Sequence, residues 1–260
     1  SSWRCRFRWF LPLILKPFFF FGSWAMSSSA KKKARVLCSL RGLSSDEVSR
    51  LRAEYEASKP YKHVVVREAC VNLNLAKVEV LNLKAIFKET DLFKVYQVPE
   101  DLRTVSAAPQ LASLREALSS LEFRNFVQKV TGCGPLSERI DCSANVYDQG
   151  GHLLCHDDVI GSRAVSYILY LVEEDWGPAD GGALELYGFR EEDGAPKNEP
   201  EAKLLPQWNS LLLFQVHDKS FHSIEEVTSR PRLTVSGWFH HHSESGDGEN
   251  ERVQGQGQGQ

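Results

Sequence analysis

The chain of 260 residues has a single methionine, Met26, and no pair of cysteines with the CxxC spacing of zinc or redox motifs. Its six cysteines, at positions 5, 38, 70, 133, 142 and 155, are scattered along the sequence. Scattered cysteines in a chain of this length predict reduced thiols in an intracellular protein and argue against a disulfide framework.

The sequence also lacks a strong excess of either charge and an apolar run long enough to span a bilayer. The formal net charge of −3 gives no general reason to expect a nucleic acid or a membrane surface as partner. Arginines followed by WFLPLIL resemble a signal peptide, but Lys16 and Pro17 interrupt the apolar run, which is too short to span a bilayer. We therefore expect residues 1–25 to be an upstream extension or an artefact of gene prediction, and Met26 to be the natural start.

Low-complexity composition at both ends predicts disorder. Residues 1–43 comprise the extension and a basic arm, whose SSSAKKKAR segment fits a solubilising arm or a weak nuclear-import signal equally well. Residues 243–260 are an acidic and Gly-Gln-rich tail. The 42% apolar and 25% charged residues allow one domain between these ends.

Helical patterns dominate residues 44–139, and strand patterns dominate residues 140–242. Ser44-x-x-Glu47 fits a capping box that begins a helix over 44–57. Residues 109–130 predict one further helix, with proline at its start and glycines beyond its end. After residue 140, six or seven short strands between turn clusters predict a β-sandwich or barrel, so the fold class is α+β.

An apolar strand, LLCHDDVIG, runs into His156 and Asp158, whose spacing of two places both side chains on one face if the strand continues. An HxD pair alone fits a polar strand end as well as a metal site. A non-haem iron triad needs one more histidine. His222 starts an alternating run, whereas we expect His217 to be solvated in a turn and the histidines at 240–242 to belong to the tail.

Arg232 stands on the strand RLTVSGWF, where every second side chain from 232 to 238 shares a face. A buried arginine is costly unless a carboxylate meets it, and a dicarboxylate cosubstrate would supply one. Arg230 precedes a proline in the turn, so we expect it to be exposed to solvent. Tyr147 and Tyr170 are strand tyrosines of the kind usually found in cores, but either hydroxyl could bind the same carboxylate.

These motifs resemble a known family in their order and spacing. HxD, P-x-W-N-x-L-L-L-F, SFH and R-x-x-x-x-x-W look like the double-stranded β-helix of Fe(II)- and 2-oxoglutarate-dependent oxygenases. More closely, the segments from Asn82 to His240 resemble the ribosomal prolyl 3-hydroxylases, which are 2-oxoglutarate and iron-dependent oxygenase domain-containing proteins. The resemblance implies a jelly-roll core at 140–242 with supporting N-terminal helices.

The resemblance also implies roles for individual residues. The three iron ligands would be His156, Asp158 and His222. The residues that bind the distal carboxylate of 2-oxoglutarate would be Arg232, Tyr147 and Tyr170. We expect Asp157 to be exposed between the two ligands, although it is one candidate for a hydrogen bond that orients a ligand histidine.

The activity implied by the resemblance is hydroxylation, at C3, of a prolyl residue of a small-subunit ribosomal protein, with an effect on translation. It requires Fe(II), 2-oxoglutarate, O2 and L-ascorbate as reductant, in the cytoplasm and nucleus, without direct binding to nucleic acid or membrane. Family members continue into a second domain, whereas this chain turns into its tail. Two alternatives therefore stay open: a hydroxylase with another peptide target, such as lysine or proline at C4, and a truncated isoform that only binds its partner. A cupin-like metal barrel would not explain the spacing of Arg232 to Trp238.

Overall fold

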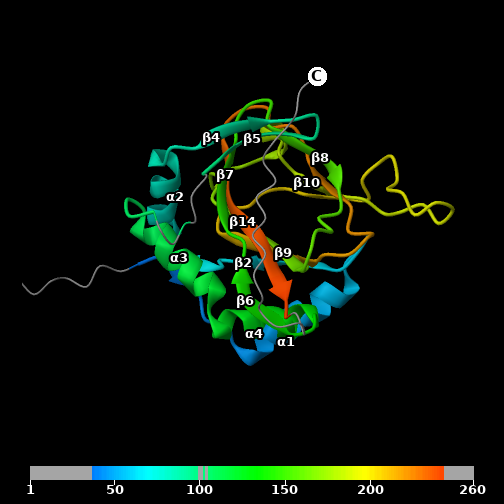
Figure 1. Ribbon diagram of the computed structural model, residues 1–260, viewed down its shortest axis with the longest axis horizontal. Coiled ribbons are helices and arrows are strands. Elements are labelled where there is room, and N and C mark those ends of the chain that lie inside the picture. Colours follow the sequence, from blue (N-terminus) through cyan, green and yellow to red (C-terminus); the bar gives the residue numbers. More distant parts are fainter. Residues whose placement is uncertain (1–36, 99–101, 103–104, 243–260) are drawn as a thin grey trace, which may run out of the picture. The chain divides into compact units, whose positions relative to one another are not determined.

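One curled antiparallel sheet with helices packed on its outer side makes up the fold (Figure 1). This computed structural model describes residues 37–98, 102 and 105–242. The expected tail at 243–260 and residues 1–36 of the expected arm lie outside the described residues. Within residues 37–43, Ser39–Leu40 forms strand β1, which pairs with β3 (Cys70–Val71).

Helix α1 (Ser45–Ala57) begins at the predicted capping box. The Glu47 backbone N–H donates to the Ser44 hydroxyl at 3.2 Å, and the Ser44 N–H donates to the Glu47 carboxylate at 2.9 Å. These two bonds satisfy N–H groups that have no partner within the first turn. The prediction of a helix over 44–57 is therefore confirmed.

The single helix predicted over 109–130 is wrong, because the chain forms two helices there. Helix α3 (Pro109–Ser119) and helix α4 (Leu121–Thr131) meet at Ser120, whose φ of −63° and ψ of 150° are extended. The hydroxyl of Ser120 accepts the Phe123 N–H at 3.2 Å and caps α4. A serine can stop a helix in this way because its side chain competes for backbone hydrogen bonds.

A twelve-stranded sheet follows the order β11-β10-β13-β8-β5-β7-β14-β9-β12-β2, with β4 paired to β5 and β6 paired to β14. Strand β5 pairs with both β7 and β8, and so joins the larger half of the sheet to the smaller one. This is the jelly roll that the resemblance implies, and the α+β fold class is confirmed. The strands not yet bounded are β2 (His63–Arg67), β4 (Ile86–Glu89), β5 (Phe93–Gln97), β6 (Leu136–Ile140), β7 (Ser143–Tyr147), β8 (His152–His156), β9 (Arg163–Tyr170), β10 (Leu184–Leu186), β11 (Ala202–Leu204), β12 (Ser210–Gln215), β13 (His222–Ile224) and β14 (Arg232–His241). The remaining helix is α2 (Leu73–Asn82), and a short 3-10 turn spans Pro178–Asp180.

The two faces of the sheet bury separate apolar clusters. In β12, Leu211 and Leu213 pack into the cluster shared with the helices, whereas Leu212 and Phe214 pack into the interior of the roll. This alternation follows from the period of two in a strand. Each side chain buried this fully stabilises the fold by about 1.5–3 kcal/mol, so both faces hold β12 in place.

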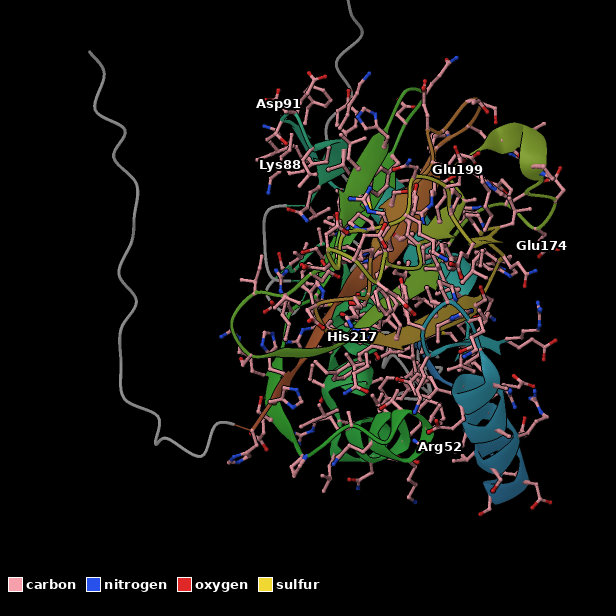
Figure 2. All side chains as sticks on the ribbon, turned by 90° about the vertical axis from the view of Figure 1, so that its right-hand side faces the viewer. Arg52, Lys88, Asp91, Glu174, Glu199 and His217 are labelled. Atoms are coloured by element: carbon pink, nitrogen blue, oxygen red, sulfur yellow. The ribbon has the colours of Figure 1, made fainter. Side chains whose placement is uncertain are left out.

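Helices α1 and α4 lie at the end of the roll opposite the β4–β5 hairpin (Figure 1 and Figure 2). Arg52 lies on α1 at one end, and Lys88 and Asp91 lie on the hairpin at the other. In the described part of the chain, no helix combines the length and the apolar composition needed to cross a membrane.

Candidate metal centre and its pocket

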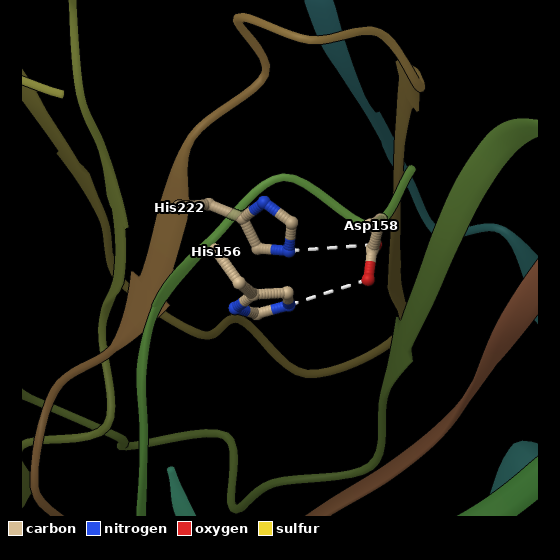
Figure 3. Close-up of side chains that lie close together, drawn as sticks. All are labelled: His156, Asp158 and His222. Atoms are coloured by element: carbon tan, nitrogen blue, oxygen red, sulfur yellow. Dashed lines mark ion pairs between the residues drawn. The ribbon is translucent and has the colours of Figure 1, made fainter. Parts of the chain in front are cut away.

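Three side chains with metal-binding groups converge inside the roll (Figure 3). Nε2 of His156 lies 3.2 Å from Oδ1 of Asp158, and Nε2 of His222 lies 3.5 Å from Oδ2 of the same carboxylate. Their candidate ligand atoms all lie within 4.8 Å of one another. Two imidazoles and one carboxylate at this spacing form the donor set of the facial triad that binds non-haem Fe(II) and leaves positions open for other ligands.

The prediction that His156 and Asp158 share one face of a continuing strand is wrong, although the two side chains do converge. Strand β8 ends at His156, and Asp158 has a φ of +66°, in the left-handed region that few residues other than glycine adopt. The carboxylate of Asp157 accepts the Val159 N–H at 3.0 Å and stabilises this turn. The expectation that Asp157 is exposed is wrong, because its side chain is half-buried and stabilises the turn.

Backbone carbonyls determine which ring nitrogen of each histidine faces Asp158. Nδ1 of His156 lies 2.8 Å from the Leu154 oxygen, and Nδ1 of His222 lies 2.8 Å from the Ser220 oxygen. Since a carbonyl only accepts, each Nδ1 carries a hydrogen, and in the neutral form of each ring Nε2 turns a lone pair toward the carboxylate. Lone pairs and a carboxylate that face one point repel each other unless a cation or a proton lies between them. The arrangement fits a metal ion.

The pKa values of Asp158 and His222 favour the forms that bind metal, whereas the pKa of His156 is raised: burial lowers it, but the hydrogen bond and the charge of Asp158 outweigh burial. Burial alone would raise the pKa of Asp158, but the hydrogen bond from His156 and the charge of the imidazoles lower it to about 2. Burial, assisted by the neighbouring His156, lowers the pKa of His222 to about 4. At neutral pH the site therefore offers an ionised carboxylate and a neutral imidazole, as metal binding requires.

A buried guanidinium marks the deep end of the site. Arg232 is 0% exposed, and its Nε donates to the Gly182 oxygen at 2.8 Å. Its guanidinium carbon lies 5.3 Å from the ring centre of Tyr147 and 5.1 Å from that of Tyr170. Among the described residues, neither Nη2 of Arg232 nor the Tyr170 hydroxyl has a hydrogen-bond partner. Two buried polar groups without partners fit the carboxylate of a bound dicarboxylic acid.

Strand pairing and one glycine place Arg232 there. Arg232 lies opposite Tyr147 in the β14–β7 pair, and its neighbour Thr234 lies opposite Tyr170 in the β14–β9 pair. Gly182 has a φ of +69°, and a Cβ at this position would lie 2.8 Å from Cδ of Arg232. The close approach of the arginine therefore requires a glycine.

The triad opens into a cavity of about 810 Å³. One wall is polar: Gln97 Nε2 donates to Asn145 Oδ1 at 2.9 Å, and Asn145 Nδ2 donates to the Ser236 hydroxyl at 3.0 Å. The rim carries exposed apolar side chains, namely Leu92, Val159 and Ile160. A polar wall and an apolar rim suit a polypeptide, which brings both amide groups and side chains.

Two other histidines take no part in this cluster. His217 lies partly exposed in the loop after β12, and its ring meets that of Tyr61 edge-on. The expectation that His240 belongs to the tail is wrong, because β14 extends to His241 and buries His240 to 2% exposure. Its Nδ1 lies 3.0 Å from the Ser162 hydroxyl.

Arg230 lies at the surface, as predicted, but it is paired with two carboxylates that the sequence did not predict. Its guanidinium pairs with Asp180 at 3.0 Å and with Asp175 at 2.7 Å, and 33% of its side chain is exposed. Both carboxylates come from the turn that precedes β10, a segment that sequence order alone does not bring near Arg230. The two pairs anchor the turn that leads into Arg232.

One contact of the triad was not predicted from the sequence. Trp238 Nε1 donates to Oδ2 of Asp158 at 2.8 Å. Because alternate residues of a strand share a face, Trp238 was predicted to lie on the same face of β14 as Arg232. This placement inside the roll could have suggested the contact with Asp158. No pattern in the sequence predicted that the guanidinium of Arg163 lies over the indole ring of Trp238.

Residues 142–240 match the family model of the 2OG-Fe(II) oxygenase superfamily. The chain is 48% identical over 171 residues to a prolyl 3,4-dihydroxylase OGFOD1 from Ostreococcus tauri, covering 61% of this chain and 33% of the relative. It is 40% identical over 189 residues to a prolyl 3-hydroxylase OGFOD1 from Xenopus laevis, covering 70% of this chain and 35% of that one. The chain thus spans about a third of the length of the curated relatives it matches.

Solved structures show the same fold at low sequence identity. A prolyl-4-hydroxylase from Pseudomonas putida is 19% identical and superposes with a TM-score of 0.54, covering 74% of this chain and 100% of its own. A prolyl hydroxylase from Trichoplax adhaerens, solved with a hypoxia-inducible-factor peptide, is 16% identical with a TM-score of 0.55, covering 75% of this chain and 91% of its own.

The jelly roll and the His-Asp-His cluster at its centre define an oxygenase domain of the 2OG-Fe(II) class. Within that class, the chain belongs to the OGFOD1 family, together with the relatives from Ostreococcus and Xenopus.

Proposed function

We propose that this chain hydroxylates a prolyl residue of a protein, using Fe(II), 2-oxoglutarate and O2. The observation that carries the proposal is the combination of two features at the centre of the roll. The triad of His156, Asp158 and His222 faces the cavity, and the buried Arg232 packs against Tyr147, which lines that cavity; Nη2 of Arg232 has no hydrogen-bond partner among the described residues. A metal triad alone would suit many proteins, whereas a buried arginine without a carboxylate partner suits one that takes up a dicarboxylic acid.

Each residue has a defined task in this proposal. His156, Asp158 and His222 hold the iron, and Arg232 with Tyr147 and Tyr170 binds the distal carboxylate of 2-oxoglutarate. The bound iron supplies oxygen activation and removal of a hydrogen atom from the substrate carbon. The chain contributes a buried site from which bulk water is excluded and a fixed orientation of both substrates.

The orientation of the cosubstrate follows from the positions of its binding groups. Arg232 would bind one end through its guanidinium, whose Nη2 has no partner among the described residues, so the other end of a five-carbon keto acid would be directed toward the triad. Tyr147 and Tyr170 flank the guanidinium and keep it from turning. Burial raises the pKa of Tyr170, so its hydroxyl stays protonated and can donate to the carboxylate.

The finer parts of the proposal concern the substrate and the cell. The protein substrate is a small-subunit ribosomal protein, hydroxylated at C3 of a proline, with L-ascorbate keeping the iron reduced and with an effect on translation. The names of the relatives support prolyl hydroxylation. The scattered cysteines and the family resemblance support a location in the cytoplasm and nucleus, which imaging of the tagged chain in cells would test.

The test of the activity is incubation of the chain with Fe(II), 2-oxoglutarate, ascorbate and the ribosomal protein, followed by mass spectrometry that locates the added oxygen. We expect one added oxygen at C3 of a proline, and loss of succinate production in His156→Ala and Asp158→Ala. Oxygen on a lysine or at C4 of a proline would identify a related hydroxylase with another target. Uptake of neither iron nor 2-oxoglutarate by the purified chain would identify a module that only binds its partner.

A further inference from the structure

The carboxylate of Asp158 has two oxygens with different surroundings. Oδ2 accepts the indole N–H of Trp238 at 2.8 Å. Oδ1 faces Nε2 of His156 at 3.2 Å, and the nearest guanidinium nitrogen of Arg163 is 3.9 Å away, too far for a hydrogen bond. Each oxygen thus faces one ligand histidine, since Nε2 of His222 lies 3.5 Å from Oδ2, but only Oδ2 also accepts a hydrogen bond from a residue outside the triad.

Trp238 cannot easily move away from this carboxylate. Its backbone exchanges two hydrogen bonds with Asp141, at 3.0 and 3.2 Å. Gly237 allows this approach, because a Cβ there would overlap the carbonyl oxygen of Asp141. The guanidinium of Arg163 lies over the indole ring at 3.4 Å from its centre and holds the side chain from the other face.

We propose that Trp238 is a positioning residue that makes Asp158 a ligand through one oxygen only, with Arg163 holding the indole in place. The inference rests on the proposed metal site. An ionised carboxylate free to turn can bind a metal ion through both oxygens and thereby occupy a further coordination position. The hydrogen bond to the indole fixes the plane of the carboxylate and uses one lone pair of Oδ2, so binding through Oδ1 alone is favoured and the three positions opposite the triad stay open for the cosubstrate and O2.

The left-handed turn explains why the carboxylate needs this support. Asp158 lies two residues beyond the end of β8, so no strand pairing restrains it, and its φ of +66° is a conformation that a non-glycine residue holds only with help from its surroundings. The hydrogen bond from Trp238 connects the turn to β14, the strand that also carries Arg232. The metal end and the carboxylate end of the site thus share one rigid strand.

The experiment measures binding of Co(II), a spectroscopic substitute for Fe(II), to the unaltered chain and to Trp238→Phe. The substitution keeps the ring and removes the N–H. We expect Co(II) to bind about 10- to 100-fold more weakly to this variant, the usual effect of losing a partner of a ligand. We also expect weaker visible absorption per bound ion, because a carboxylate that binds through two oxygens raises the coordination number.

Trp208→Phe is the matched control, because it removes an indole N–H from a partly buried tryptophan outside the cavity. Its Co(II) affinity and spectrum should equal those of the unaltered chain. Equal affinity and an equal spectrum in Trp238→Phe would overturn the inference.

Arg163→Met tests the same inference if Trp238→Phe does not fold. This variant keeps the N–H but removes the stacked guanidinium, so we expect weaker Co(II) binding and a change of spectrum in the same direction. Unchanged binding and spectrum would overturn the inference. Failure of the unaltered chain to bind Co(II) would instead overturn the proposed function, so the two failures can be told apart.

Discussion

His222 lies directly opposite His156 in the β13–β8 pair, and the centres of their rings are 4.2 Å apart. Strand pairing therefore brings together two ligands that are far apart in the sequence. Because β13 has only three residues, His222 to Ile224, its register depends on the neighbours β10 and β8. The integrity of the metal site is thus a direct measure of correct pairing in the smaller half of the roll.

His222→Ala should abolish metal binding, whereas His217→Ala should leave it unchanged. The first substitution removes one of the three ligands, so the affinity for Fe(II) or Co(II) should fall by about 100-fold or more, beyond the usual effect of losing a ligand's partner. The second removes a histidine that lies partly exposed in the loop just before β13. Titration with Co(II) measures both. Equal loss in the two variants would contradict the assignment of His222.

Arg232→Lys should raise the KM for 2-oxoglutarate by about 10- to 100-fold, because an ammonium cannot form the two parallel hydrogen bonds of a guanidinium. The variant keeps the positive charge, so a small effect would mean that charge alone binds the cosubstrate. Arg230→Lys serves as the control: the guanidinium of Arg230 is already paired with Asp175 and Asp180, so the KM of this variant should stay the same. Steady-state kinetics with varied 2-oxoglutarate measures both.

Gly182→Ala should destabilise the fold by about 1–3 kcal/mol, the usual magnitude for a strained backbone position. The added Cβ would lie 2.8 Å from Cδ of Arg232 and 3.1 Å from Cγ2 of Val227, at a φ of +69°. Gly161→Ala is the matched control, because Gly161 has a φ of +57° with nothing within 4 Å. Urea unfolding of the two variants separates the effect of crowding from that of φ. Equal losses would mean that crowding against Arg232 contributes nothing.

The stability of the chain should fall at low pH partly because of Asp180. The hydrogen bond from Arg230, with the Gly177 N–H and the Ser229 hydroxyl, holds the pKa of Asp180 at about 2, below its ordinary value of 3.8. A lowered pKa stabilises the folded state above the ordinary value, and this contribution is lost as the pH falls toward 2.

Asp180→Asn removes that contribution at every pH. The difference in the free energy of unfolding between the unaltered chain and Asp180→Asn should therefore be constant above about pH 5 and should shrink as the pH falls through 4 toward 2. Urea unfolding across this range measures it. A difference that stays constant down to pH 2 would contradict the role of the ion pair.

Ser120→Ala should destabilise the fold by about 0.5–2 kcal/mol, because α4 loses its N-cap. The neighbour Ser119 is the control, since its hydroxyl donates only to the Glu116 oxygen within α3. Ser119→Ala should change the free energy of unfolding by less than the first variant does. Equal effects would mean that the junction of α3 and α4 does not depend on the cap.

Local patterns in the sequence sufficed for the elements that are stabilised locally. The capping box of Ser44 and Glu47 needs only neighbouring atoms, so the start of α1 followed from the sequence. Alternation along β12 likewise follows from the period of a strand. The break at Ser120 did not follow, because the apolar positions on both sides of it keep a helical spacing and the break is visible only in the backbone angles.

For the candidate site, residue types and spacing led to His156, Asp158, His222 and Arg232, and the fold brings the first three together. The prediction that His156 and Asp158 share a strand face was incorrect, because the left-handed turn at Asp158 does not follow from a periodic pattern of residue types. The buried state of His240 and the ion pairs of Arg230 were missed for a related reason: their partners lie on segments distant in sequence.

The sequence by itself determined the kinds of chemical groups, their order along the chain and the alternation that turns them inward, since these depend on residue type and on local geometry. The tertiary structure alone decided what each group meets. It places the Trp238 N–H on Asp158 and Arg163 over the indole ring, and it leaves Nη2 of Arg232 without a hydrogen-bond partner in the part of the chain that the structure describes. Such contacts depend on how distant strands pair and curl, which no short stretch of sequence specifies.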